Sequence, residues 1–212
     1  MKTQKSKPSK ESKLKILAAG DIHGDFDIAK LLAAKAKSNK VDLVVLAGDL
    51  HGMIEGTSDM IIEPFKKNHQ KVVFVPGNWD SSLEVDMLKE MHKIKNIDGY
   101  YVTYNGVDIV GIGNPDFKMS FNQKEARKKL SENFDRIRAK GGKKILVSHL
   151  HASGTKAEFS GFKGEKVLRD AIEYFQPDVF ISAHIHEAEG IEEKIGKTRV
   201  INVGRRGKII EV

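Results

Sequence analysis

The sequence predicts an α/β protein in which two mixed β-sheets pack against each other and are flanked by helices. In the first half of the chain, apolar runs of strand length alternate with segments that have the spacing of amphipathic helices. Near the middle, an Asn-Gly pair at residues 105–106 separates two strand-like runs, which is the strongest short-range signal of a hairpin. After residue 188, short strand-like runs follow one another with glycines between them. Alternating strands and helices followed by a hairpin and a closing β stretch favour two packed mixed sheets.

The chain begins with a βαβ unit. The apolar run at residues 14–19 predicts a buried strand, and the next apolar run, at 41–47, predicts a second one. Between them, residues 27–38 have apolar side chains at helical spacing, and Asp27 is placed to cap this helix. A crossover of this kind implies parallel strands and a right-handed connection.

Two further helices and one strand complete the first half of the chain. Helices are expected over residues 56–69 and 82–93, and Thr57 or Ser58 is expected to cap the first of them. Between the two helices, the apolar run at 71–76 predicts another buried strand.

The second half starts with a hairpin, whose strands are expected at residues 100–104 and 107–111. A long amphipathic helix is expected next, over residues 121–140. The glycine-rich segment 152–164 is expected to be a loop that either borders a substrate site or is an ordinary surface loop. The other elements expected here are a strand at 144–147, a helix at 165–175, a strand at 178–182 and three short strands after residue 188.

Length and composition indicate one domain. The 212 residues suffice for a full core, and we expect residues 14–212 to form a single domain. The formal net charge of +7 favours anionic partners, including a phosphorylated substrate. The absence of cysteine excludes disulfides and thiolate metal ligands, and no apolar run reaches the length of a membrane span. We therefore expect a cytoplasmic protein that has no contact with a membrane.

The first thirteen residues differ from the rest of the chain. Residues 1–13 are polar and carry five dispersed lysines, so we expect a disordered basic tail. Lysines without interleaved aromatic residues are more typical of a solvated charge run than of a nucleic-acid or membrane contact.

Polar residues with metal-binding chemistry follow five of the predicted strands. In open α/β sheets, ligand sites lie at the carboxyl ends of the strands, so a recurrence of this kind favours a shared site. The residues concerned, in chain order, are Asp21 and His23, Asp49, Asn78 and Asp80, His149, and His184 and His186.

In this order, the motifs resemble those of the calcineurin-like metallophosphoesterases, which read DxH, GD, GNH followed by an acidic residue, a lone His, and GHxH. The matching residues here are Asp21-Ile22-His23, Gly48-Asp49, Gly77-Asn78-Trp79-Asp80, His149 and Ala183-His184-Ile185-His186. Two positions depart from the pattern, because Trp79 replaces a histidine and Ala183 replaces a glycine. The resemblance implies a four-layer αββα sandwich and a metal-dependent phosphoesterase.

The resemblance also implies two divalent metal ions. The first would be held by Asp21, His23, Asp49 and His186, and the second by Asp49, Asn78, His149 and His184. Two cations about 4 Å apart need a shared anionic ligand, here Asp49, and can deprotonate a bridging water near neutral pH. The hydroxide would then attack phosphorus in line, while Asn78 helps to hold the phosphoryl oxygens. Nitrogen and oxygen ligands without sulfur suit manganese, iron or zinc, and the ligand spacing does not choose among them. We expect manganese first, with iron or zinc as alternatives.

Further residues are expected around the ligands. Asp25 and Asp80 are expected to orient metal ligands through hydrogen bonds. Arg205 and Arg206 lie in a glycine-flanked turn, where they either bind the substrate phosphate or are solvated.

The residue after Asn78 raises a separate question about proton donation. In the family, a histidine there is placed to protonate the leaving oxygen, and an indole cannot do this. Either His51 or His151, each two residues after a predicted ligand, takes over this role, or the enzyme works without a general acid. Trp79 is alternatively an apolar wall on which a flat part of the substrate stacks.

Three functional classes follow from these patterns. The first is a phosphoesterase, either a phosphatase or a phosphodiesterase, that acts on a small phosphorylated molecule. The second is a nuclease, which the basic charge allows but which the lack of room for a DNA-binding cap disfavours. The third is a non-catalytic protein-interaction scaffold, which would tolerate the loss of ligands, whereas all seven are present.

Overall fold

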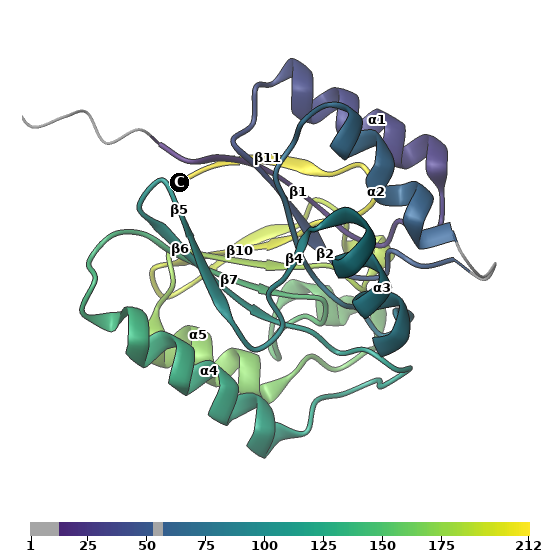
Figure 1. Cartoon of the computed structure of the whole chain (residues 1–212). Helices are drawn as coiled ribbons and strands as arrows, with labels where there is room; N and C mark the ends of the chain where they lie inside the picture. The colour runs from purple at the N-terminus through teal and green to yellow at the C-terminus, as the bar shows by residue number, and fades with distance from the viewer. Residues whose placement is uncertain (1–12, 53–56) are drawn as a thin grey trace, which may run out of the picture.

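The computed structural model describes residues 13–52 and 57–212. The expected tail, up to residue 12, and the expected cap side chains at positions 57 and 58 lie outside what is described. The chain forms two β-sheets, with one group of helices beside each (Figure 1). No helix in the described part of the chain is both long enough and apolar enough to cross a membrane.

The first sheet has the strand order β11-β1-β2-β3-β4. Strands β1 to β4 are parallel, and β11 runs antiparallel to β1 at the edge. The elements are β1 (Lys15–Ala19), α1 (Phe26–Ser38), β2 (Leu43–Ala47), α2 (Thr57–Lys67), β3 (Val72–Val75), α3 (Ser82–His92), β4 (Lys95–Asn96) and β11 (Lys208–Glu211).

The second sheet has the order β5-β6-β7-β8-β10-β9. Its inner strands are parallel, whereas β5 and β9 pair antiparallel with their neighbours at the two edges. The elements are β5 (Tyr101–Tyr104), β6 (Val107–Ile112), α4 (Gln123–Arg138), β7 (Lys144–Ser148), the 3₁₀ helix η1 (Lys156–Ser160), α5 (Lys166–Phe175), β8 (Val179–Ser182), η2 (His186–Ala188), β9 (Glu192–Ile195) and β10 (Thr198–Asn202).

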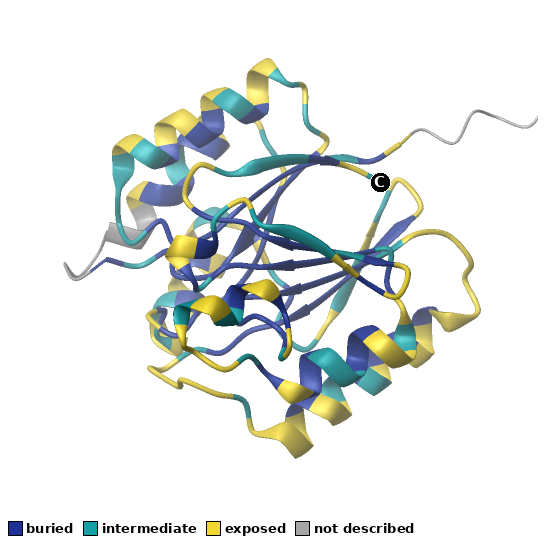
Figure 2. Cartoon of the chain, turned by 180° about the vertical axis from the view of Figure 1, so that it is seen from behind, coloured by how far each residue is buried: buried dark blue, intermediate teal, exposed yellow. Residues whose placement is uncertain are grey.

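Three buried apolar clusters hold these elements in four layers. The middle cluster lies between the sheets and includes Ile16, Val45 and Ile181. A second cluster joins the outer face of the first sheet to α1, α2 and α3, and a third joins the second sheet to α4 and α5. Figure 2 shows the same division, with buried strands at the centre and helices exposed on their outer sides. The predicted αββα sandwich of two mixed sheets is therefore confirmed.

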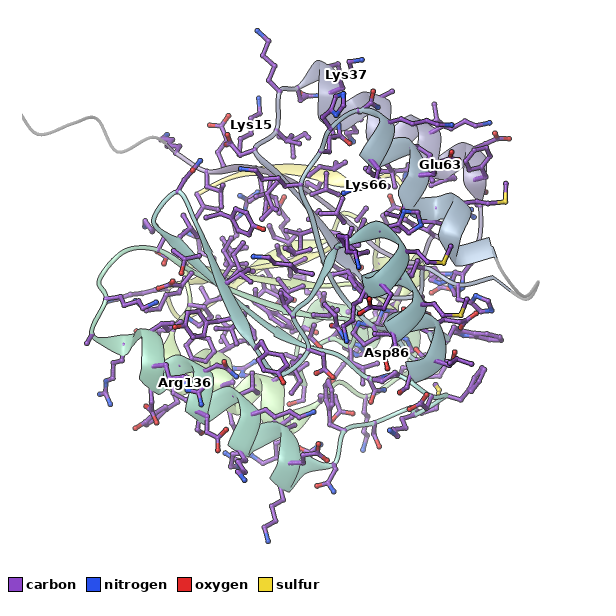
Figure 3. The ribbon with its side chains drawn as sticks, in the orientation of Figure 1. Lys15, Lys37, Glu63, Lys66, Asp86 and Arg136 are labelled. Carbon is purple, nitrogen blue, oxygen red and sulfur yellow. The ribbon has the colours of Figure 1, made fainter. Side chains whose placement is uncertain are left out.

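The outer faces of the helices carry charged side chains. Figure 3 labels several of them, among them Lys37, Asp86 and Arg136, which lie on α1, α3 and α4. All three are exposed, and Asp86 pairs with Lys89 one turn further along α3. These residues lie on faces that the apolar clusters do not use, so the charge pattern follows the layers.

Most predicted elements are found within a few residues of their expected ends, with two corrections. The N-cap of α1 is Asp25, whose side chain accepts a hydrogen bond from Ile28 N at 3.1 Å, and not Asp27. Strand β4 and the 3₁₀ helices η1 and η2 were not predicted, since such short elements show no hydrophobic period, and η1 lies inside the segment 152–164 that was expected to be a loop. The hairpin is confirmed, and Asn105 and Gly106 both have positive φ, as a tight turn between β5 and β6 requires.

Candidate metal centre

The predicted ligands meet where the carboxyl ends of the two sheets come together. Asp21 and His23 follow β1, Asp49 follows β2, Asn78 follows β3, His149 follows β7, and His184 and His186 follow β8. The first four come from one sheet and the last three from the other. In each case a buried strand ends shortly before the polar residue, so the core fixes the backbone from which the side chain starts.

One group of ligand atoms comes from Asp21, His23 and His186, all within 4.8 Å of one another. The two imidazoles approach closely, with 3.2 Å between His23 Nε2 and His186 Nε2. His186 Nε2 also lies 3.7 Å from Asp21 Oδ1. Two ring nitrogens and a carboxylate oxygen thus converge from strand ends of different sheets.

A second group comes from Asp49, His149 and His184, again within 4.8 Å. His149 Nε2 lies 3.2 Å from Asp49 Oδ2, 3.3 Å from His184 Nδ1 and 3.0 Å from Asn78 Oδ1. The same Asp49 oxygen is 3.7 Å from His23 Nε2, which belongs to the first group. Asp49 therefore lies between the two groups and links them.

Unusual backbone conformations place several of these side chains. Four predicted ligands have φ in the left-handed region: Asp21 (55°), His23 (49°), Asp49 (53°) and His184 (69°). Such conformations cost about 1–3 kcal/mol each outside glycine and gather at functional sites. Hydrogen bonds between the strand ends compensate, because Asp21 N donates to Gly48 O at 3.0 Å and His23 N donates to Asp49 O at 2.9 Å.

Asp80 holds the segments that carry two of the ligands. Its Oδ1 accepts hydrogen bonds from Leu50 N and His51 N, and its Oδ2 accepts one from Gly77 N, all within 2.9 Å. These donors lie next to Asp49 and Asn78 in the chain, so one buried carboxylate fixes both ligand-bearing segments. Burial, together with the nearby Asp49 charge, raises the pKa of Asp80 to about 6. That Asp80 orients metal ligands through these hydrogen bonds stays a prediction.

The buried charges favour a cation between them. Burial raises the pKa of Asp21 to about 6 and lowers the pKa of His184 to about 4. Burial also opposes the charged form of His149, yet the Asp49 carboxylate outweighs it and raises the pKa of His149 to about 9. Asp49 thus favours a positive charge beside it, which either a proton on His149 or a divalent cation supplies.

The residues fit the metal ions that the sequence predicts. Asp21 Oδ2 is buried and has no hydrogen-bond partner in the described part of the chain. A buried carboxylate oxygen is costly without a partner, and a cation would provide one. His149 Nδ1 lies 2.8 Å from Ala47 O, a contact that orients the ring and turns Nε2 toward the other ligands.

Asp25 and the two arginines make contacts away from the ligand atoms, and both arginines are exposed, as the solvated alternative expects. The carboxylate of Asp25 caps α1 and accepts a hydrogen bond from Arg205 Nη2 at 2.6 Å, so both of its oxygens are engaged away from the ligand atoms. Arg206 donates to Glu189 Oε1 from its backbone N and from Nε, both at 3.0 Å. Each arginine therefore has an acidic partner of its own, and neither lines the cavity at the metal centre.

The two histidines expected as proton donors are also held by other groups. His51 Nδ1 lies 2.6 Å from Glu84 Oε1 at the start of α3. His151 Nε2 lies 3.2 Å from Phe162 O, and burial lowers the pKa of this imidazole. The His151 ring lies parallel to that of His184, 6.3 Å away, but neither His51 nor His151 lines the cavity.

A cavity of about 690 Å³ opens beside the ligands. Trp79 lines it, and so do three apolar residues that sequence reasoning missed: Phe117, Met119 and Phe162. Phe162 belongs to the loop expected at 152–164, which thus borders the site. The sequence contained only a weak indication of these lining residues, namely large apolar side chains within the polar connections that follow β6 and β7. The full lining is His23, Asp49, Asn78, Trp79, Phe117, Met119, Phe162, His184, Ile185, His186 and Glu187.

Solved structures with the same fold are known. A Thermus thermophilus protein, TT1561, has a TM-score of 0.74 at 15% identity over 95% of this chain and 99% of its own. A dimetal phosphatase from Danio rerio, LOC 393393, has a TM-score of 0.63 at 13% identity over 92% and 88%. A protein described as a novel archaeal phosphodiesterase has a TM-score of 0.53 at 15% identity over 93% and 98%. At these identities, the likeness shows the fold.

No curated protein matches the sequence. The family model of the calcineurin-like phosphoesterases, in contrast, matches residues 14–188, a span that contains all seven predicted ligands. This match covers most of the chain and agrees with the four layers and with the two groups of ligand atoms. The chain therefore belongs to the calcineurin-like phosphoesterase family and is a metal-dependent phosphoesterase.

Proposed function

We propose that this protein hydrolyses a small phosphomonoester or phosphodiester at a dinuclear metal centre. The observation that carries the proposal is the position of Asp49 Oδ2, 3.2 Å from His149 Nε2 in one group and 3.7 Å from His23 Nε2 in the other. A carboxylate between two ligand groups is what a pair of cations needs to offset their repulsion. The proposed ligands are Asp21, His23, Asp49, Asn78, His149, His184 and His186.

The bound cations would supply a water of lowered pKa and would polarise the phosphoryl oxygens. The chain's own groups bind and orient the substrate. Asn78 turns Oδ1 toward His149 and Nδ2 toward the cavity, where Met119 Sδ is 3.8 Å away. The Nδ2 amide can therefore donate a hydrogen bond to a phosphoryl oxygen while Oδ1 serves as a ligand.

Manganese is the first candidate for the cations, with iron and zinc as alternatives. Imidazole nitrogens together with carboxylate and amide oxygens suit all three, and the chain has no cysteine that would select a softer metal. Metal content after purification, measured with each metal offered in the growth medium, distinguishes them.

The test of the function is a panel of phosphomonoesters, phosphodiesters and nucleotides assayed with Mn²⁺. Asp49→Ala should lose both metals and all activity, because each group loses the carboxylate that it shares with the other. Asp86→Ala is the matched control, since Asp86 is an exposed residue of α3 (Figure 3). Full metal retention in Asp49→Ala, measured by elemental analysis, would contradict the shared-ligand assignment.

A further inference from the structure

We infer that the cavity beside the metal centre selects phosphoesters that carry a flat aromatic group, which packs against a wall made by Trp79, Phe117 and Met119. The inference rests on the proposed function and names the substrate class for the same site. All three wall residues are large and apolar, yet 40%, 65% and 59% of their surfaces are exposed. Exposed apolar side chains gathered in one cavity are typical of a ligand site.

The wall begins next to the ligands. The Trp79 ring lies 6.1 Å from the ring of His23 and 5.8 Å from the ring of Phe117, edge to face in both cases. Met119 Sδ lies 3.8 Å from the Nδ2 atom of Asn78. A group attached directly to the phosphate, or through one sugar, would therefore reach the wall while the phosphoryl group is at the metal centre.

The wall is built onto the segment that supplies a ligand. Phe117 N donates to Asn78 O at 2.8 Å, and Asp116 N donates to Asp80 O at 3.0 Å. The Asp116 carboxylate also accepts hydrogen bonds from Ser82 N and Ser82 Oγ, at 2.8 and 2.7 Å. These hydrogen bonds join the connection after β6 to the connection after β3 at the edge of the cavity.

The hydrogen bonds between these two connections stabilise an unfavourable backbone conformation at the wall. Asp116 and Phe117 are consecutive residues with φ of 66° and 57°. Aspartate tolerates this left-handed conformation, whereas a bulky residue such as phenylalanine seldom adopts it. Backbone strain of this kind persists only where surrounding contacts determine it, and it gathers at ligand sites. The Phe117 side chain thereby lies against Trp79 and the cavity, not in the core.

The charge of the lining agrees with a neutral flat group. Among the described residues that line the cavity, none is Lys or Arg, and Glu187 is acidic. The metal centre is therefore the part of the site that binds the negative charge of the substrate, and it binds one phosphoryl group. Additional phosphates of a substrate would have no cationic side chain to contact on the wall. An aromatic ring needs none, because aromatic side chains bind it through its face.

The single tryptophan of the chain makes the wall observable. Trp79 is the only tryptophan in the sequence, so its fluorescence reports this surface alone. The manganese-loaded protein is mixed with adenosine 5′-monophosphate or with ribose 5-phosphate in a stopped-flow instrument and read before turnover. The two compounds share sugar and phosphate and differ in the base. We expect the adenosine compound to quench Trp79 and to bind at least about fivefold more tightly, the lower end of what one base stack contributes.

A second pair of ligands tests whether the wall accepts any aromatic group or only a nucleobase. Benzylphosphonate and ethylphosphonate bind without hydrolysis and differ only in the ring. A preference in both pairs indicates that any aromatic group is accepted, and a preference in the adenosine pair alone indicates nucleobases. Equal affinities within both pairs would overturn the inference.

Phe117→Ala is the decisive variant, and Phe159→Ala is its control. Both phenylalanines are exposed to a similar extent, 65% and 62%, and Phe159 does not line the cavity. Phe117→Ala should bring the affinity ratio of the adenosine pair close to one, whereas Phe159→Ala should leave it unchanged. An unchanged ratio in Phe117→Ala overturns the inference. If the protein hydrolyses esters but shows no preference for aromatic groups, the inference about the wall is wrong and the proposed function stands. If it prefers aromatic ligands but hydrolyses no ester, the proposed function is wrong and the inference about ligand binding stands.

Discussion

At the scale of single residues, Trp79 predicts how the proposed reaction treats its leaving group. The histidine that the family has at this position would protonate the departing oxygen, a step worth about 10²- to 10⁴-fold in rate. An indole has no acidic proton to give near neutral pH. The two alternatives that the sequence offers, His51 and His151, do not line the cavity beside the ligands. Leaving-group departure without protonation is therefore the expected course.

The wild-type protein should accordingly show a steep dependence of log kcat on the pKa of the leaving group, with aryl esters hydrolysed far faster than alkyl esters. Trp79→His should make this dependence shallower by restoring a proton donor. The measurement is a series of aryl and alkyl esters assayed with both proteins and with His51→Ala and His151→Ala. A shallow dependence in the wild type and in both alanine variants would show that another donor exists.

At the scale of single elements, the start of α1 illustrates both the strength and the limit of sequence reasoning. The helix itself was predicted, because its apolar side chains recur at helical spacing. The cap was not, because Asp25 and Asp27 are both good capping residues and only the turn after His23 decides between them. That turn depends on the segment after β2, through the bonds from His23 N to Asp49 O and from Gly24 N to Leu50 O.

The cap provides a test with a matched control. Asp25→Ala should lower the free energy of unfolding by about 1 kcal/mol, the usual cost of a lost N-cap. Asp27→Ala, two residues further on and exposed, should change it by less than about 0.5 kcal/mol. Urea unfolding gives both values. Equal effects of the two substitutions on the free energy of unfolding would contradict the assignment of Asp25 as the N-cap.

The connections were the least predictable elements. Phe117 and Phe162 lie in segments without hydrophobic period, so nothing local tells an exposed aromatic residue at a cavity from one in a core. Their positions depend on hydrogen bonds to distant backbone, such as that from Phe117 N to Asn78 O. The convergence of the predicted ligands, in contrast, could be expected from the sequence, because each comes shortly after a buried strand whose end is marked by the apolar pattern.

At the scale of the whole molecule, the two sheets approach each other closely beside the metal centre. A Cβ built on Gly20 would lie 2.6 Å from Cβ of Ala183 and 3.1 Å from Ala47 O. Gly20 follows β1 in the first sheet, and Ala183 follows β8 in the second. The family's glycine before the last histidine pair is replaced here by Ala183, and Gly20 leaves the space for its methyl group.

This contact predicts coupled substitutions. Gly20→Ala should separate the sheets locally, lower the free energy of unfolding by about 1–3 kcal/mol and reduce metal content. Adding Ala183→Gly should recover part of this loss, since it removes the methyl group that clashes, although Ala47 O remains close. A double-mutant cycle measured by denaturant unfolding gives the coupling. Strict additivity of the two changes would contradict the packing described.

The origin of the ligands in both sheets has a consequence for how the protein responds to metal supply. Cations bound there would tie one sheet to the other, and a ligand that binds only the folded state stabilises it by mass action, about 2.7 kcal/mol at a hundredfold excess over Kd. For a chain of this size, that corresponds to a rise in Tm of roughly 5–10 °C. A chelator should therefore lower the Tm of the wild type by about this amount in calorimetry and leave Asp49→Ala unaffected. An identical Tm with and without chelator would show that the cations do not connect the sheets. If the cations connect the two sheets, the concentration of free metal determines the fraction of protein that stays folded on heating, as well as the rate of catalysis.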